Sequence, residues 1–80
     1  MKTYTPRGVC SRKILFETEN NIVQNVQFIG GCPGNLEAIA LLVEGMPVDE
    51  VIKRLKGISC GEKPTSCPDQ LARALEQNQQ

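Results

Sequence analysis

Four cysteines constrain this chain more than any other feature of its sequence. They are Cys10, Cys32, Cys60 and Cys67, and they are spread over only 80 residues. The apolar core of a chain this short yields only about 3–5 kcal/mol of stability, so such folds often add a metal ion, a disulfide or a partner chain. Histidine is absent, which excludes histidine-based general bases and metal triads. The cysteines are therefore the first candidates for a site.

The charge balance narrows the partners that the chain is expected to have. Nine basic and nine acidic residues give a net charge of zero, which argues against binding to nucleic acid or to an anionic membrane. The longest apolar run, residues 38–43, is far short of the roughly 18 residues that cross a bilayer. Residues 1–6 lead into no apolar stretch, so we expect no secretory signal and a cytoplasmic protein. Thiols stay reduced there, which favours metal binding over disulfides.

Two β-strands joined in a hairpin are predicted for the first part of the chain. Residues 9–18 and 22–29 alternate between polar and apolar side chains, and Asn20 and Asn21 between them tolerate the positive φ of a turn. One face of the first strand is expected to hold Cys10, Arg12, Ile14 and Phe16, with Lys13 and Glu17 on the other, and one face of the second to hold Ile22, Val26 and Phe28. Antiparallel pairing would place Cys10 opposite Gly30, with Cys32 at the same end of the sheet.

Three helices are predicted after the hairpin. The first is capped by Asn35 and stops at Gly45, the second covers residues 47–56, and the third begins in residues 65–69 with Ser66 and Asp69 as a capping box. Their apolar stripes are Leu36, Ile39, Ala40 and Val43; Val48, Val51, Ile52 and Leu55; and Leu71, Ala74 and Leu75. We therefore expect a single α+β domain over residues 1–80, of order ββααα, with an N-terminal arm at 1–8 and a frayed tail at 77–80.

The positions of the cysteines favour metal binding. Each lies where an element begins or ends, and in a folded chain such breaks let thiolates converge. The spacing contains no CxxC pair, so two alternatives stay open: inert packed thiols, and a redox pair of Cys60 with Cys67. Four thiolates would suit zinc, which is the expected ion, or an iron–sulfur cluster. No catalytic residue is predicted.

The cysteines stand in motifs that resemble the TSCPD-domain family. The motifs are residues 65–72, which read TSCPDQLA, together with GVCS at 8–11, GGCPGN at 30–35 and GISCG at 57–61. Related domains occur at the C-terminal end of some ribonucleotide reductases. The resemblance implies a metal-binding accessory module, with a ribonucleotide reductase or a thiol-redox protein as partner and nucleotide binding as a family association. A chain of this length cannot hold the reductase barrel, so we expect no activity from it alone.

A weaker similarity is to the U-type iron–sulfur scaffold proteins. Cys10, Cys32 and Cys67 would take the three cysteine positions of that family. Arg12 stands where those proteins have an aspartate, and Cys60 is an additional thiol that would close the site. An iron–sulfur scaffold or carrier is therefore the first alternative function. A partner-binding or homo-oligomeric domain with incidental cysteines is the second.

Overall fold

The fold is an antiparallel sheet followed by three helices, which confirms the predicted α+β class. The computed structural model describes residues 2–9, 11–31, 33–59 and 61–78. Cys10, Cys32 and Cys60 lie outside these residues, so the predictions made for them stay predictions. The elements are β1 (Lys2–Tyr4), β2 (Ser11–Glu19), β3 (Ile22–Gly30), α1 (Pro33–Val43), α2 (Val48–Leu55) and α3 (Cys67–Asn78).

The turn between β2 and β3 has the predicted position and geometry. Asn20 and Asn21 have φ values of 53° and 65°. A two-residue loop with positive φ at both positions is a type I′ turn, whose twist matches that of the flanking strands. Asparagine adopts this conformation more readily than other non-glycine residues. The prediction of a hairpin is therefore confirmed.

A third strand was not expected from the sequence. Lys2 pairs with Phe16 and Tyr4 with Ile14, so residues 2–4 form an edge strand beside β2 instead of belonging to a loose arm. Three residues are too few to show an alternating pattern, and the strand depends on pairing with β2. The other end of the chain also holds more structure than expected, because α3 continues to Asn78.

A bulge near the start of β2 changes which side chains face the core, so the predicted alternation is wrong there. Ser11 pairs with Gly30 and Lys13 with Ile29, so two steps along β2 match one step along β3. The extra residue shifts the alternation. As a result Ser11 is buried and Arg12 is exposed, although alternation predicts that Arg12 shares the face of the buried Ile14. The partner of Gly30 is Ser11, one residue away from the expected position.

A second irregularity lies in β3. Leu15 pairs with Gln27 and Glu17 with Gln24, which leaves Asn25 as the extra residue, with a φ of 54°. Val23 and Val26 are three residues apart, yet both are buried. Strict alternation had selected Val26 and missed Val23. Such bulges bend the strand locally and increase its twist.

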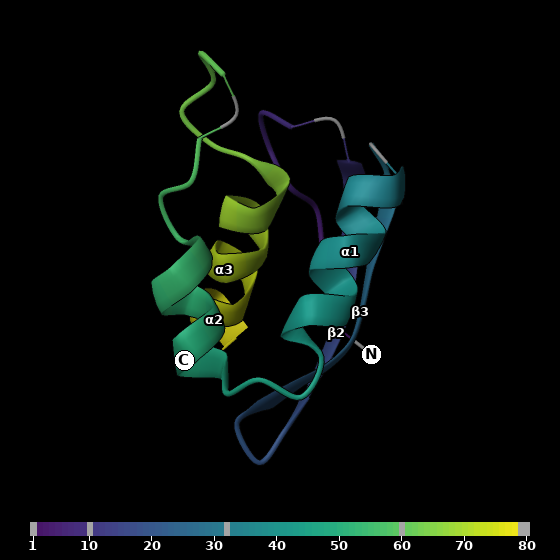
Figure 1. Ribbon diagram of the computed structural model, residues 1–80, viewed down its shortest axis with the longest axis vertical. Coiled ribbons are helices and arrows are strands. Elements are labelled where there is room, and N and C mark those ends of the chain that lie inside the picture. Colours follow the sequence, from purple (N-terminus) through teal and green to yellow (C-terminus); the bar gives the residue numbers. More distant parts are fainter. Residues whose placement is uncertain (1, 10, 32, 60, 79–80) are drawn as a thin grey trace.

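All three helices contribute to one core with the sheet. α1 lies against β3, and α2 lies against α3 (Figure 1). α1 begins at Pro33, two residues before the predicted cap, and proline is well suited to the first turn of a helix. The core residues are Ile14, Phe16, Val23, Val26, Val43, Val48, Val51, Leu71, Ala74 and Leu75.

The connection from α1 to α2 covers part of the outer edge of β3. Val23 donates its N–H to the carbonyl of Met46 and accepts a hydrogen bond from the N–H of Gly45, both at 2.8 Å. The N–H of Asn25 is bound by the Glu44 carboxylate, also at 2.8 Å. These contacts satisfy edge groups that would otherwise invite pairing with another chain.

Gly45 is expected to be required for this connection, and Gly34 is not. Gly45 has a φ of +82° just after α1, whereas Gly34 lies inside the helix, and a Cβ at either position would meet no atom within 4 Å. Gly45→Ala should therefore destabilise the protein by about 1 kcal/mol through backbone strain alone. Gly34→Ala should stabilise it by roughly 0.5 kcal/mol because alanine favours the helix. Urea denaturation of both variants tests this, and a loss of stability in Gly34→Ala would contradict it.

Candidate functional site

Cys67 is the predicted ligand that lies within the described residues. It is the first residue of α3, as predicted, and only 7% of it is exposed. In the part of the chain that the structure describes, no three side chains of His, Cys, Asp or Glu come together. The other three cysteines lie outside that part, but residues within two positions of each of them are described.

Ser11 joins the start of β2 to Cys67. Its Oγ lies 3.1 Å from the sulfur of Cys67, and both side chains are buried. Ser11 is also the pairing partner of Gly30, the last residue of β3. The start of β2, the end of β3 and the first residue of α3 therefore meet at one place. Ser11 directly follows Cys10 in the chain, and Gly30 precedes Cys32 by two residues.

A second contact brings the segment before Cys10 to the same end of α3. Gly8 lies so close to Thr65 that a Cβ built on it would be 3.2 Å from the Thr65 Cγ2. Gly8 also has a φ of +74°, which favours glycine. The backbone on either side of Cys10 is thus held near the N-terminus of α3.

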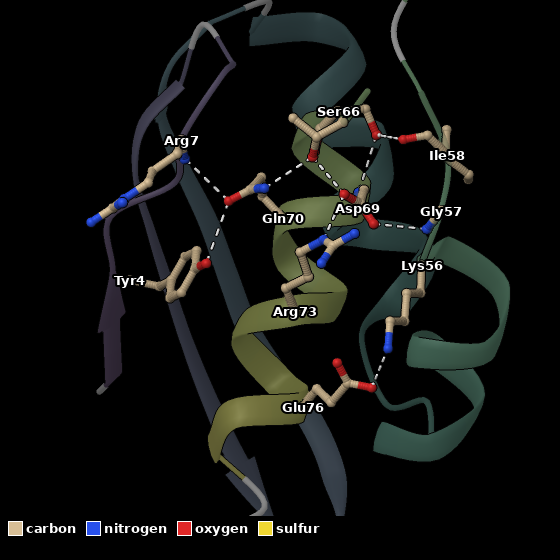
Figure 2. A network of polar contacts seen from close by, with 11 residues as sticks. Tyr4, Arg7, Lys56, Gly57, Ile58, Ser66, Asp69, Gln70, Arg73 and Glu76 are labelled. Carbon is tan, nitrogen blue, oxygen red and sulfur yellow. Dashed lines mark hydrogen bonds and ion pairs between the residues drawn. The ribbon is translucent and has the colours of Figure 1, made fainter. Parts of the chain in front are cut away.

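The connection between α2 and α3 is fastened to the same helix end. Ser66 donates its hydroxyl to the carbonyl of Ile58 at 2.7 Å, and the Asp69 carboxylate accepts the N–H of Gly57, also at 2.7 Å (Figure 2). Ile58 precedes Cys60 by two residues. The two described residues Gly57 and Ile58, which precede Cys60, are therefore bound to residues within two positions of Cys67.

Asp69 is the centre of this polar network. It is fully buried, and its carboxylate accepts hydrogen bonds from the Gly57 N–H, the Thr65 hydroxyl and the Arg73 guanidinium. Burial would raise the pKa of Asp69, but the bonds from Gly57, Thr65 and Arg73 outweigh it, so this pKa is lowered. Its own N–H is bound by the Ser66 Oγ at 3.1 Å, which confirms Ser66 as the helix cap. The carboxylate does not complete the predicted capping box, because it binds Gly57 instead.

Gln70 extends the network to the N-terminal segment. Its Oε1 accepts the N–H of Arg7 at 3.1 Å and faces the hydroxyl of Tyr4 at 3.4 Å (Figure 2). Its Nε2 donates to Thr65 at 2.9 Å. The first turn of α3 thus holds two distant segments, residues 4–7 and 57–58, in fixed positions.

The described neighbours of all four cysteines therefore gather at one end of the molecule. The start of β2, the end of β3, the N-terminus of α1, the connection between α2 and α3, and the N-terminus of α3 all lie at the top of Figure 1. Sequence reasoning missed Ser11, because strict alternation placed it on the outer face. Its only signal was its position next to a cysteine in the GVCS block at residues 8–11.

Comparison with known proteins supports the family suggested by these motifs. The model of the TSCPD domain family matches residues 2–79. Searches of curated proteins and of solved structures found no significant match. Among the described residues, no helix is both long and apolar enough to cross a membrane. Since the family match covers nearly all of the chain, from β1 to the end of α3, this chain belongs to the TSCPD domain family.

Proposed function

We propose that this protein is a non-catalytic, metal-binding accessory module of ribonucleotide reduction. Its ligands would be Cys10, Cys32, Cys60 and Cys67, and its metal zinc. The observation that carries the proposal is the set of contacts around the N-terminus of α3. These contacts join Cys67 to Ser11, Ser11 to Gly30, and Ser66 to Ile58. Each of these residues is within two positions of one of the cysteines.

The chemistry of this end of the molecule suits a thiolate-bound metal. Cys67 opens α3, where the helix dipole and the free N–H groups of the first turn favour negative charge. The Ser11 hydroxyl is within hydrogen-bond distance of the sulfur. Four thiolates form a closed tetrahedral site for zinc, and such sites act by stabilising the fold. A bound zinc ion would cross-link the hairpin to the loop and to α3.

The role in ribonucleotide reduction rests on family membership. We place the protein in the cytoplasm, where thiols stay reduced. The predicted partner is a ribonucleotide reductase or a thiol-redox protein. Size-exclusion chromatography of the zinc-loaded protein with the ribonucleotide reductase of the same organism tests the first of these. The expected result is that the zinc-loaded protein elutes in a complex with the reductase, and that this complex is lost when a chelator removes the zinc. Separate elution of the two proteins at micromolar concentration would remove the reductase as the partner.

Metal content is the decisive measurement for the site. Protein purified without an affinity tag, under anaerobic conditions, is expected to hold one zinc ion per chain by elemental analysis. Cys60→Ser should lower both zinc content and melting temperature, because serine is a poor zinc ligand. Ser59→Ala is the matched control, since it changes an exposed side chain next to the same cysteine and should leave both values unchanged.

Three other results would separate the alternatives. An unchanged zinc content in Cys60→Ser would remove Cys60 from the ligands. A visible absorption band after loading with iron and sulfide, in protein that holds no zinc, would favour the iron–sulfur scaffold. If the native protein holds neither zinc nor an iron–sulfur cluster and its four thiols titrate freely, the cysteines would be incidental.

A further inference from the structure

We propose that Ser11 is a positioning residue for the sulfur of Cys67, which it orients and stabilises as a thiolate ligand. The inference rests on the proposed metal site and adds a residue outside the ligand set. Metal ligands are commonly held by hydrogen bonds from residues that do not touch the metal. Ser11 is placed to give such a bond, because its Oγ lies 3.1 Å from the Cys67 sulfur.

The backbone of β2 is irregular at the point that turns Ser11 inward. In a regular strand the residue three positions before the buried Ile14 would face outward, together with the exposed Lys13. The bulge between Ser11 and Lys13 reverses this and leaves Ser11 only 3% exposed. Bulges often re-aim a side chain beside a functional site. Here the re-aimed side chain is a hydroxyl, and it faces a sulfur atom.

The direction of the hydrogen bond follows from the protonation state of the sulfur. A thiol and a hydroxyl can each donate to the other, so either atom can be the donor in the metal-free protein. A metal-bound thiolate has no proton, so the hydroxyl of Ser11 must then be the donor. A charged sulfur in a residue that is only 7% exposed needs such a partner, because water reaches the residue poorly. The hydrogen bond from Ser11 therefore stabilises the sulfur most when a metal is bound.

A bond from Ser11 lowers the energy of the sulfur lone pairs and so changes the spectrum of a bound metal. Cobalt(II) is the probe, because it replaces zinc in tetrahedral sites and shows sulfur-to-cobalt charge-transfer absorption. In Ser11→Ala this band should move to lower energy, since the lone pairs are no longer stabilised. Competition with a chelator should show about 10-fold weaker cobalt binding, in line with other residues that support metal ligands.

Two further variants separate positioning from packing. Ser11→Thr retains the hydroxyl and should restore the band energy of the wild-type protein. Ser59→Ala removes a hydroxyl next to another proposed ligand, but its side chain is exposed and the band should not move. Circular dichroism of each variant confirms that it is folded before its spectrum is compared. A packing defect alone would weaken binding without moving the band.

The outcomes distinguish the two proposals. Wild-type protein without any charge-transfer band would overturn the metal site, and the role of Ser11 with it. A wild-type band that is identical in folded Ser11→Ala would overturn the role of Ser11 alone and leave the metal site standing. A band that moves equally in Ser11→Ala and Ser11→Thr would also overturn it, because the hydroxyl would then not be the cause.

Discussion

Replacing Asp69 with alanine is expected to lower the free energy of unfolding by about 3 kcal/mol, much of the stability of so small a domain. The variant leaves the N–H of Gly57 and the hydroxyl of Thr65 without their acceptor in a partly buried place. Hydrogen bonds to a charged group are worth more than neutral ones, and donors left unpaired add to the loss. Urea denaturation gives the difference.

Glu50→Gln is the matched control for this variant. Glu50 also accepts a hydrogen bond from an arginine four residues away, Arg54, at 2.8 Å, but both side chains reach solvent, with 67% of Arg54 and 38% of Glu50 exposed. Such exposed pairs contribute little, so no measurable change is expected. Equal effects in Asp69→Ala and Glu50→Gln would show that burial of the Asp69 network does not matter.

The pH dependence of stability gives an independent check on Asp69. Its pKa in the folded protein is lowered from an ordinary value of 3.8. A lowered folded-state pKa means that the carboxylate stabilises the fold fully above pH 3.8, and that this stabilisation is lost as the pH falls through the folded-state pKa. Wild-type protein should therefore lose stability in that acid range more steeply than Asp69→Ala. Parallel curves for the two proteins would contradict this assignment.

The parts of the fold that depend on local sequence were predictable. Asn20 and Asn21 favour a positive φ whatever surrounds them, and Gly45 ends a helix for the same reason. The buried pair Val48 and Val51 follows directly from helical spacing. Each of these features needs only the residue and its near neighbours in the chain.

The features that depend on distant partners were not predictable. Tyr4 belongs to a strand only because Ile14 pairs with it. The bulge beside Arg12 reverses the face of Ser11, and no residue type near it requires a bulge. The sequence predicts a local capping box for Asp69, but its carboxylate binds the N–H of Gly57, twelve residues earlier. An acid in the first turn of a helix gives no sign of such a partner.

In the candidate site, too, the features set by local sequence were predictable and those set by distant partners were not. The position of Cys67 at the start of α3 follows from a local helix signal, and the structure confirms it. The expected closeness of Cys10 to Cys32 depended on the register of the hairpin, and those two residues lie outside the described ones. What the structure adds is Ser11, whose contact with Cys67 links residues 56 positions apart.

With the proposed zinc site in place, Leu71→Ala is expected to make folding depend on zinc. Leu71 is fully buried in α3, within the cluster that joins the sheet to the helices. Its truncation should cost about 3–4 kcal/mol, the usual cost of replacing a buried leucine by alanine. A core of this size supplies only about 3–5 kcal/mol, so the chelated variant should be largely unfolded at room temperature.

Zinc should restore the fold of this variant, because an ion that binds only the folded state adds its binding free energy to stability. Far-UV circular dichroism, with chelator and then with excess zinc, follows the helices through both states. Leu42→Ala, at a position 76% exposed on α1, is the control and should stay folded in both. Refolding of Leu71→Ala by zinc would show that the metal site and the core stabilise one cooperative unit. A chelated variant that stays fully folded would mean that the core is sufficient alone. Failure to refold in zinc would count against the proposed zinc site.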